Sequence, residues 1–215
     1  MKSDKPQFYV GLLGAGILIT FGAYYWFVKS PYFEPFNLWT QSNLVLFYVS
    51  LFVIKFVGLI WPPLPGGVFV LGSIPIIGWS NAYLIDFGAS ASASSIAFVL
   101  GRKYGMPLIS KITNREIIEK IQKIKIKKER EFETIFLLRV FGGAVLVEIV
   151  SYASGLFRLS YKNFILGTLL SHLAIGIPFY FFVGSIFSGK NLIFGIITAA
   201  ILALIIYKFK DRYLA

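Results

Sequence analysis

The run Trp61-Pro62-Pro63-Leu64-Pro65-Gly66-Gly67 interrupts an apolar stretch that extends from Asn43 to Trp79. Proline lacks an amide hydrogen and its ring clashes with the preceding turn, so this run cannot lie inside a continuous helix. Each half of the stretch is too short to cross a bilayer, which takes about 20 apolar residues. Broken backbone at membrane depth persists only where it is buried in protein or lines a wet cavity. The stretch therefore predicts a re-entrant helical hairpin.

The composition of the 215-residue chain predicts an integral membrane protein. Hydrophobic residues make up 57% and charged residues only 14%, whereas soluble domains carry about 25% charged residues. The net charge of +11 is concentrated in loops and tails, as in the cytoplasmic flanks of membrane spans. No basic stripe is interleaved with stacking aromatics, which argues against nucleic-acid binding. The absence of cysteine excludes disulfides, thiolate metal sites and cysteine catalysis.

Four further apolar segments are predicted to cross the membrane. The first is interpreted as a permanent helix rather than a signal peptide, because no small-residue cleavage pattern follows it. Pro31 and Pro35 are expected to keep the connector after it from continuing as a helix. The second segment is rich in small residues, which favours close helix packing in lipid, and Gly176 and Pro178 predict a kink in the third. The four segments are Phe8–Val28, Asn81–Arg102, Tyr161–Phe187 and Asn191–Tyr207.

A second interrupted apolar stretch, Phe132–Leu156, contains Gly142 and Gly143 at its break. A second re-entrant hairpin is the preferred interpretation, and a single kinked span is the alternative. Between the two halves, Lys111–Glu133 is predicted to be a basic amphipathic helix. This helix lies either on the cytoplasmic membrane surface or in a solvated linker.

The positive-inside rule places both termini and the central basic loop on the cytoplasmic side. Four crossings plus two hairpins that enter from opposite faces satisfy this rule. The predicted fold is therefore an all-α integral membrane protein with about four spans and two opposed re-entrant hairpins in an inverted repeat, an arrangement typical of secondary transporters. The predicted divisions, within one domain overall, are residues 1–43, 44–103, 104–133, 134–187 and 188–215.

Three pieces of this sequence resemble the DedA superfamily, also called the VTT-domain or SNARE-associated Golgi protein family. The first is similar to the Pro/Gly motif of the family's first hairpin, the second to the Gly-Arg-x-x-Gly that ends the following helix, and the third to an arginine followed by Asn-Tyr-x-x-Gly. In chain order they are Pro63-Leu64-Pro65-Gly66, Gly101-Arg102-Lys103-Tyr104-Gly105, and Arg139 with Ser151-Tyr152-Ala153-Ser154-Gly155. The resemblance extends over roughly residues 44–187.

This resemblance implies movement of phospholipids or polyprenyl-phosphate carriers between leaflets, in some members coupled to protons or sodium. It also implies that Pro65, Gly66, Tyr152 and Gly155 belong to the transport site. The chain departs from the family pattern at several positions. Lys55 and Gly67 stand where bacterial members usually carry acidic residues, Gly142 replaces an expected proline, and an arginine or proline near Val145 is absent. These departures put ion coupling in doubt more than the lipid role.

Charged residues at membrane depth are the candidate functional groups, because burying them is costly. Arg139 is the leading candidate, since its planar guanidinium suits a phosphate headgroup; the alternative is a structural pair with Glu148. Glu148 either carries a proton or pairs with Arg139. Lys55 either attracts phosphate, replaces a coupling cation, or extends to the interface. The amides of Gly66, Gly142 and Gly143 are expected to assist in binding.

The other polar residues in apolar segments are given structural roles. Asp86 is expected near a helix start as a cap or interfacial group, and Arg102 and Arg158 as headgroup anchors at helix ends. His172 is interpreted as a hydrogen-bonded packing residue in preference to a proton relay. Because it has no Cys, Asp or Glu near it in sequence, we predict no metal site.

The sequence shows no nucleophile elbow and no P-loop or dinucleotide motif, so we expect neither an enzyme nor a cofactor. The leading hypothesis is a lipid translocator in the cell membrane, with Arg139 and Lys55 in a polar groove where the hairpin tips meet. Its partners would be membrane lipids, and an oligomer is possible. The alternatives are a proton- or cation-coupled transporter of a small solute, and a membrane scaffold that binds anionic lipid or partners through the basic helix.

Overall fold

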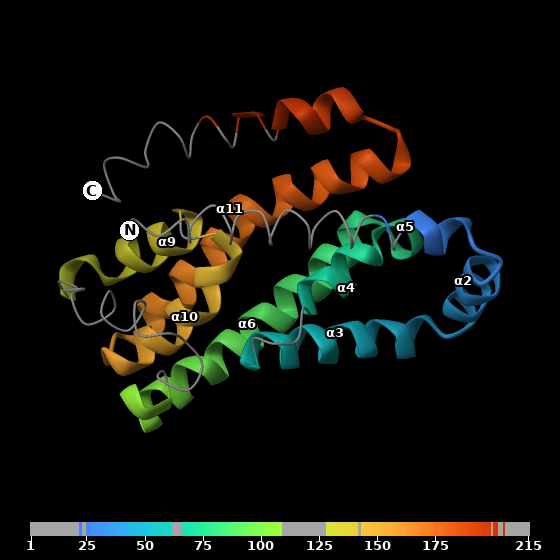
Figure 1. The fold of residues 1–215 in the computed structure, drawn as a ribbon. Coiled ribbons are helices and arrows are strands. Elements are labelled where there is room, and N and C mark those ends of the chain that lie inside the picture. Colours follow the sequence, from blue (N-terminus) through green and yellow to red (C-terminus); the bar gives the residue numbers. More distant parts are fainter. Residues whose placement is uncertain are drawn as a thin grey trace, which may run out of the picture. The chain divides into compact units, whose positions relative to one another are not determined.

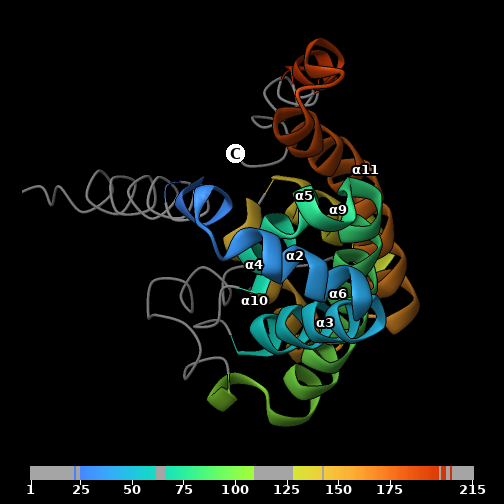
Figure 2. The ribbon, with the colours of Figure 1, turned by 90° about the vertical axis from the view of Figure 1, so that its right-hand side faces the viewer.

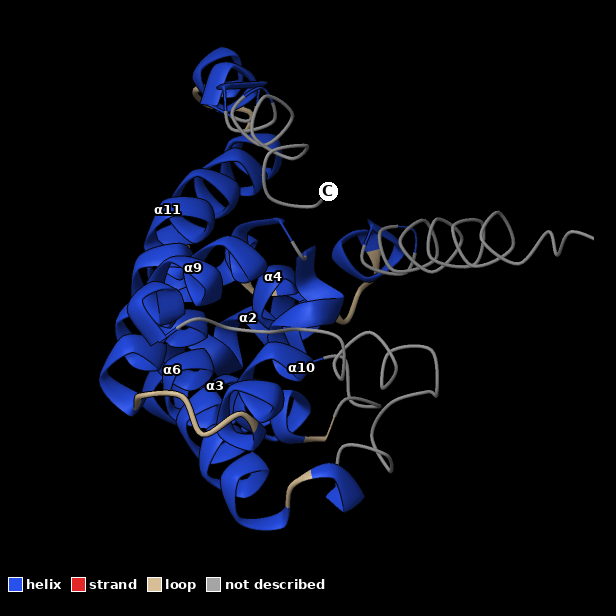
Figure 3. Ribbon diagram, turned by 90° about the vertical axis from the view of Figure 1, so that its left-hand side faces the viewer, coloured by secondary structure: helices blue, strands red, loops and turns tan. Residues whose placement is uncertain are grey.

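The computed structural model describes residues 22, 25–61, 66–108, 128–141, 143–198, 200, 201 and 204, with the side chains of residues 143–148 left out. The described residues form helices and connecting turns without any strand (Figure 3). This confirms the all-α prediction for the described part. The chain forms two compact units, Met1–Phe47 and Tyr48–Ala215, and each is considered by itself.

The first unit contains helix α2 (Phe33–Ser42) and the first turn of α3 (Leu44–Ile60). The prediction that the prolines prevent helix continuation is confirmed at Pro31, which lies in a turn after the helical residues 25–29, and is wrong at Pro35, which lies within α2. Pro35 is the third residue of α2, where an amide has no acceptor within the helix, so the missing N–H costs nothing. Edge-to-face contacts between aromatic rings also stabilise this unit. The centre of the Phe36 ring lies 5.5 Å from that of Phe27 and 5.9 Å from that of Phe47.

The second unit is organised around α6 (Trp79–Tyr104), which contacts helices on several sides (Figure 1). Two short helices, α4 (Gly66–Gly72) and α5 (Ile74–Ile77), pack together against it (Figure 2). The remaining elements are the short helix η1 (Lys128–Arg130), α9 (Glu131–Phe141), α10 (Gly143–Leu156) and α11 (Tyr161–Ser188). Helix α9 packs on α10 and α11, and residues 192–198 are helical beyond α11.

Two described helices, α6 and α11, are long and apolar enough to cross a membrane, and a third candidate arises if α2 and α3 are counted as one bent span. Both confirm predicted spans, and α11 runs through Gly176 and Pro178 as one helix. The predicted span Phe8–Val28 and the basic segment Lys111–Glu133 lie mostly outside the described residues. Of the predicted span Asn191–Tyr207, residues 191–198, 200, 201 and 204 are described, and residues 192–198 are helical. Of the basic segment, Glu131–Glu133 form the first turn of α9.

The two predicted breaks coincide with helix ends. Helix α3 ends at Ile60 and α4 begins at Gly66, while α9 ends at Phe141 and α10 begins at Gly143. At the first break the chain turns back on itself, because a Cβ atom on Gly66 would lie 2.7 Å from the Ile54 carbonyl oxygen. Residues 62–65 and Gly142, at the turns themselves, lie outside the described residues. Re-entry of these segments into a bilayer therefore stays a prediction.

The backbones of α6 and α10 touch where they cross. A Cβ atom on Gly101 would lie 2.1 Å from the Tyr152 carbonyl oxygen, and one on Gly155 would lie 2.0 Å from that of Phe98. Ala97 packs beside this crossing and is fully buried together with Tyr152. In lipid, helix association depends on packing rather than on expulsion of water, so small residues at a crossing are stabilising. The small-residue run of the sequence correctly predicts a packing helix.

We expect Gly155→Ala to destabilise the protein by about 3 kcal/mol, because the added methyl group requires the two backbones to separate. The free energy of unfolding in mixed detergent micelles measures this effect. Gly88→Ala is the matched control, since its Cβ would make an ordinary 3.5 Å contact with the Phe52 ring. Equal stability of the two variants would contradict the close crossing.

Candidate functional site: two buried charged centres

The Arg139 guanidinium lies where four helices meet. Arg139 belongs to α9 and is 7% exposed. Its Nη2 atom donates to Ser94 Oγ of α6 at 3.3 Å and to Ser151 Oγ of α10 at 2.6 Å. The guanidinium carbon lies 5.6 Å from the centre of the Phe164 ring of α11, a cation–π arrangement. The predicted burial of this arginine is confirmed.

Arg139 retains hydrogen-bonding capacity. Its Nε atom is buried and makes no hydrogen bond to a described residue. No described carboxylate lies within ion-pair distance of it. The Glu148 side chain lies outside the described part, so the predicted alternative of an Arg139–Glu148 pair stays a prediction. Within the described residues, uncharged hydroxyls and an aromatic ring surround the cation.

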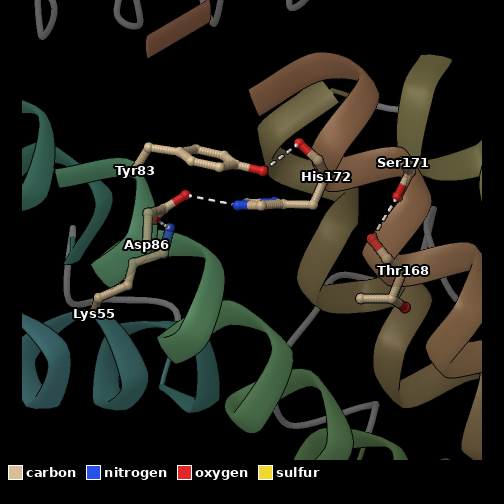
Figure 4. A network of polar contacts seen from close by, with 6 residues as sticks. All are labelled: Lys55, Tyr83, Asp86, Thr168, Ser171 and His172. Atoms are coloured by element: carbon tan, nitrogen blue, oxygen red, sulfur yellow. Dashed lines mark hydrogen bonds and ion pairs between the residues drawn. The ribbon is translucent and has the colours of Figure 1, made fainter. Parts of the chain in front are cut away.

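A second charged centre joins α3, α6 and α11. Lys55 Nζ lies 2.9 Å from Asp86 Oδ1, and His172 Nε2 lies 3.1 Å from Asp86 Oδ2 (Figure 4). The Asp86 side chain is 6% exposed, whereas those of Lys55 and His172 are 19% and 22% exposed. The two basic groups therefore flank a carboxylate that lies deeper than either. We refer to these three residues as the Asp86 triad.

Aromatic rings enclose the histidine side of the triad. The Tyr83 ring stacks on the imidazole at a centroid distance of 5.8 Å and an interplanar angle of 17° (Figure 4). The Tyr83 hydroxyl also donates to the His172 carbonyl oxygen at 3.5 Å. Gly176 provides the space for this ring, because a Cβ atom there would lie 2.7 Å from Tyr83 Cε2. The sequence analysis assigned Gly176 to a kink, and its role in the structure is to admit an aromatic side chain.

The triad corrects two sequence interpretations. Asp86 is not a cap near a helix start, because α6 begins at Trp79 and Asp86 lies buried in its third turn. His172 is not without an acidic neighbour, since Asp86 is adjacent to it in space. Both residues lie in apolar segments. Because a charge inside the membrane is costly, their presence there is the sequence signal that they need partners. The spacing of Asp86 and His172 along the sequence does not predict that these two residues pair.

A strip of buried polar residues extends from one charged centre toward the other. On α6 it comprises Asp86, Ser90 and Ser94, at successive helical turns. On α11 it comprises His172 and Thr168, one turn apart, and the Thr168 hydroxyl makes no hydrogen bond to a described residue. Asp86 and Ser94 are eight positions apart on α6, which is about 12 Å along a helix axis. The strip therefore lines the α6–α11 contact between the two charged centres.

The other predicted site residues are distributed around these centres. The Tyr152 hydroxyl donates to the Ile60 carbonyl oxygen at 3.0 Å, which holds the last residue of α3. Gly155 makes the α6–α10 crossing, and Gly66 packs against α3 beside Lys55. Pro65 and Gly142 lie outside the described residues, and Gly143 is the first residue of α10.

Polar side chains hold two helix termini. Arg102, an exposed residue in the last turn of α6, donates from Nη2 to the Leu159 carbonyl oxygen, and its guanidinium carbon lies 4.6 Å from the Phe98 ring centre. Its place at the lipid headgroups stays a prediction. The Glu131 carboxylate accepts from the Ser160 amide and from Asn163 Nδ2, each at 3.0 Å. These bonds hold the first turn of α11 in place, and thereby set the position of His172 along the axis of that helix.

Residues 63–186 match the family model described as the VTT domain. The chain belongs to the VTT-domain family. This is the domain of the DedA and SNARE-associated proteins, so the resemblance inferred from the motifs is confirmed. Neither the curated proteins nor the solved structures yield a significant match.

The VTT domain of this chain contains both charged centres except for Lys55. Asp86, Arg139 and His172 all lie within the matched residues, whereas Lys55 lies before them. No group of three or more His, Cys, Asp or Glu side chains gathers in the described part of the domain in a way that could hold a metal ion. The chemistry available is that of fixed cations, a carboxylate, an imidazole and hydroxyls.

We expect Asp86→Asn to destabilise the VTT domain by about 3 kcal/mol, because it leaves the Lys55 ammonium buried without its counter-charge. Lys55→Met should cost a similar amount, and the double variant should recover part of the loss. A double-mutant cycle on the free energy of unfolding in detergent measures this coupling. Lys162→Met, at an exposed position, is the control. Additive effects of the two single substitutions would contradict the ion pair.

Proposed function

We propose that this VTT-domain protein translocates lipids that carry a phosphate headgroup, either phospholipids or polyprenyl phosphates, between the leaflets of the cell membrane. The observation that supports the proposal best is the buried Arg139 guanidinium, whose Nε makes no hydrogen bond to any described residue. A buried cation whose described partners are hydroxyls and a ring is not neutralised by them, so binding of an anion would lower its electrostatic free energy. A phosphate oxygen satisfies both that charge and the free donor.

The neighbours of Arg139 suit transient binding. Ser94 and Ser151 accept from the guanidinium at present, and a hydroxyl can also donate. When an anion arrives, the same serines can turn their protons toward its oxygens. The guanidinium would therefore exchange hydrogen bonds to neutral hydroxyls for hydrogen bonds to an anion, without requiring a new charged residue.

The apolar faces of the helices suit the lipid tails. Large exposed hydrophobic side chains cover the outer sides of α6 and α11. Examples are Leu84, Val99, Leu166, Leu170 and Ile177. Acyl or isoprenoid chains would remain in the bilayer along these faces while the headgroup crosses inside the protein. Such exchange runs down a concentration gradient and needs no cofactor. Cytoplasmic location of both termini is part of the same proposal.

The test is leaflet exchange in liposomes that contain the purified protein, with a fluorescent phospholipid and a fluorescent polyprenyl phosphate as substrates. We expect Arg139→Gln to lower the exchange rate about tenfold or more, since a charge-assisted hydrogen bond contributes about 1.5–3 kcal/mol. Arg158→Gln, which alters an exposed arginine, is the matched control. Exchange no faster than in empty vesicles for both substrates would refute the proposal.

A proton-coupled transporter of a small solute is the second candidate. The contact between Asp86 and His172 favours it, because a buried carboxylate and imidazole 3.1 Å apart can share a proton. Glu148 stays a second candidate proton carrier. Uptake of solute driven by a pH gradient, abolished in Glu148→Gln or His172→Gln, would support this function over lipid exchange. The scaffold hypothesis depends on the basic segment, most of which lies outside the described residues.

A further inference from the structure

The Asp86 triad has the geometry of a site that is open on its basic side. The Lys55 and His172 side chains retain about a fifth of their accessible surface, whereas Asp86 is almost fully covered. Gly67 lies next to the ammonium, since a Cβ atom there would lie 3.4 Å from Lys55 Nζ. The absence of a side chain at Gly67 leaves room beside the lysine. A ligand that approaches the triad therefore meets two nitrogen groups before it meets the carboxylate.

The charge of the triad depends on one proton. With a neutral imidazole, the Lys55 ammonium and the Asp86 carboxylate cancel. With an imidazolium, the triad carries one net positive charge in a region of low dielectric constant, where an uncompensated charge is costly. Among the described residues, the other titratable groups that face it are the hydroxyls of Tyr83 and Tyr180, and α4 and α5 contain no ionisable side chain. None of these groups supplies the missing negative charge.

We propose that the Asp86 triad is a second anion site, which takes up a phosphodiester anion together with a proton on His172. The imidazolium then pairs with Asp86, and the Lys55 ammonium, sharing that carboxylate with a second cation, turns to the phosphate. The charge of the imidazolium and the charge of the anion compensate each other, which lowers the free-energy cost of burying either one. Binding of the proton and binding of the anion therefore favour each other. By thermodynamic reciprocity, lower pH strengthens anion binding and anion binding draws in a proton.

This inference deepens the proposed function, because it rests on a phosphate-bearing lipid as the physiological anion. The polar strip of Ser90, Ser94 and Thr168 leads from the triad toward Arg139. Two anion sites at different depths along α6 give a headgroup successive positions during its passage. Of the two centres, the triad is the one whose described residues include an imidazole, the group to which the proposal assigns the proton.

The test is equilibrium binding to the purified protein in a non-ionic detergent, at about pH 5.5 and about pH 8. The two probes are a short-chain phosphatidylglycerol and dimethyl phosphate, which keep one negative charge over this range. We expect the wild type to bind about tenfold more tightly at the lower pH, within the usual range of coupling between sites. Proton uptake on binding, measured in weak buffer, should accompany the tighter binding.

Variants of the triad separate the roles of its members. All of these variants are compared in an Arg139→Gln background, which removes the other proposed anion site. There His172→Gln should bind weakly at both pH values, while His172→Lys, with a charge that persists at both, should bind tightly at both. Lys55→Gln should lose binding at both, and Lys162→Gln should behave as the unsubstituted triad. A wild-type affinity that is independent of pH, or pH dependence retained in His172→Gln, would overturn the proposal. Binding of neither probe would also overturn it.

The two probes identify the source of the anion. Binding of both supports a site for phosphodiesters in general, and binding of phosphatidylglycerol alone supports a lipid site; either result upholds the proton linkage if it depends on His172. Because leaflet exchange is not the quantity measured, the outcome is independent of the liposome assay. Proton-linked binding without exchange would refute the translocator function alone, and exchange without proton-linked binding would refute the triad site alone.

Discussion

The arrangement of the VTT domain depends on the contact between the backbones of α6 and α10. Gly101 and Gly155 let these helices approach until carbonyl oxygens occupy the positions of the missing side chains. In lipid no hydrophobic force drives helices together, so such a contact must come from complementary shape. The same crossing brings Ser94 of α6 and Ser151 of α10 to opposite sides of Arg139. The position of the buried cation thus follows from the packing of the glycines.

The charged residues follow a single rule. A charge in a low-dielectric interior is either compensated by an opposite charge or by hydrogen bonds, or it can bind a charged ligand. Asp86 is matched by Lys55 and His172, and Glu131 by hydrogen bonds at the start of α11. Arg139 differs, since its described partners are uncharged. The two proposed anion sites are therefore distinguished by how completely the described residues neutralise the charges of each, and not by the residue types alone.

The sequence predicts the elements of this fold better than their contacts. Helix ends at Ile60, Gly66 and Phe141 follow from local backbone chemistry, because proline and glycine act on their own segment. Burial of Arg139 follows from the hydropathy around it. The Asp86 triad could not be predicted, since its members come from three helices and which side chains meet depends on helix rotation. The sequence predicts a helix that begins at Asn81, close enough to Asp86 for a capping or interfacial role, whereas α6 begins at Trp79.

The bond from the Tyr152 hydroxyl to the Ile60 carbonyl oxygen links α10 to the end of α3. Ile60 is the final residue of α3, where the carbonyl oxygens of a helix have no amide donor within the helix. A displacement of α10 that keeps this bond must move the end of α3 with it. Lys55 lies five positions before Ile60 on α3, and Gly66 packs against the backbone beside it. The position of α10 and the position of the Lys55 ammonium are therefore coupled through this hydrogen bond.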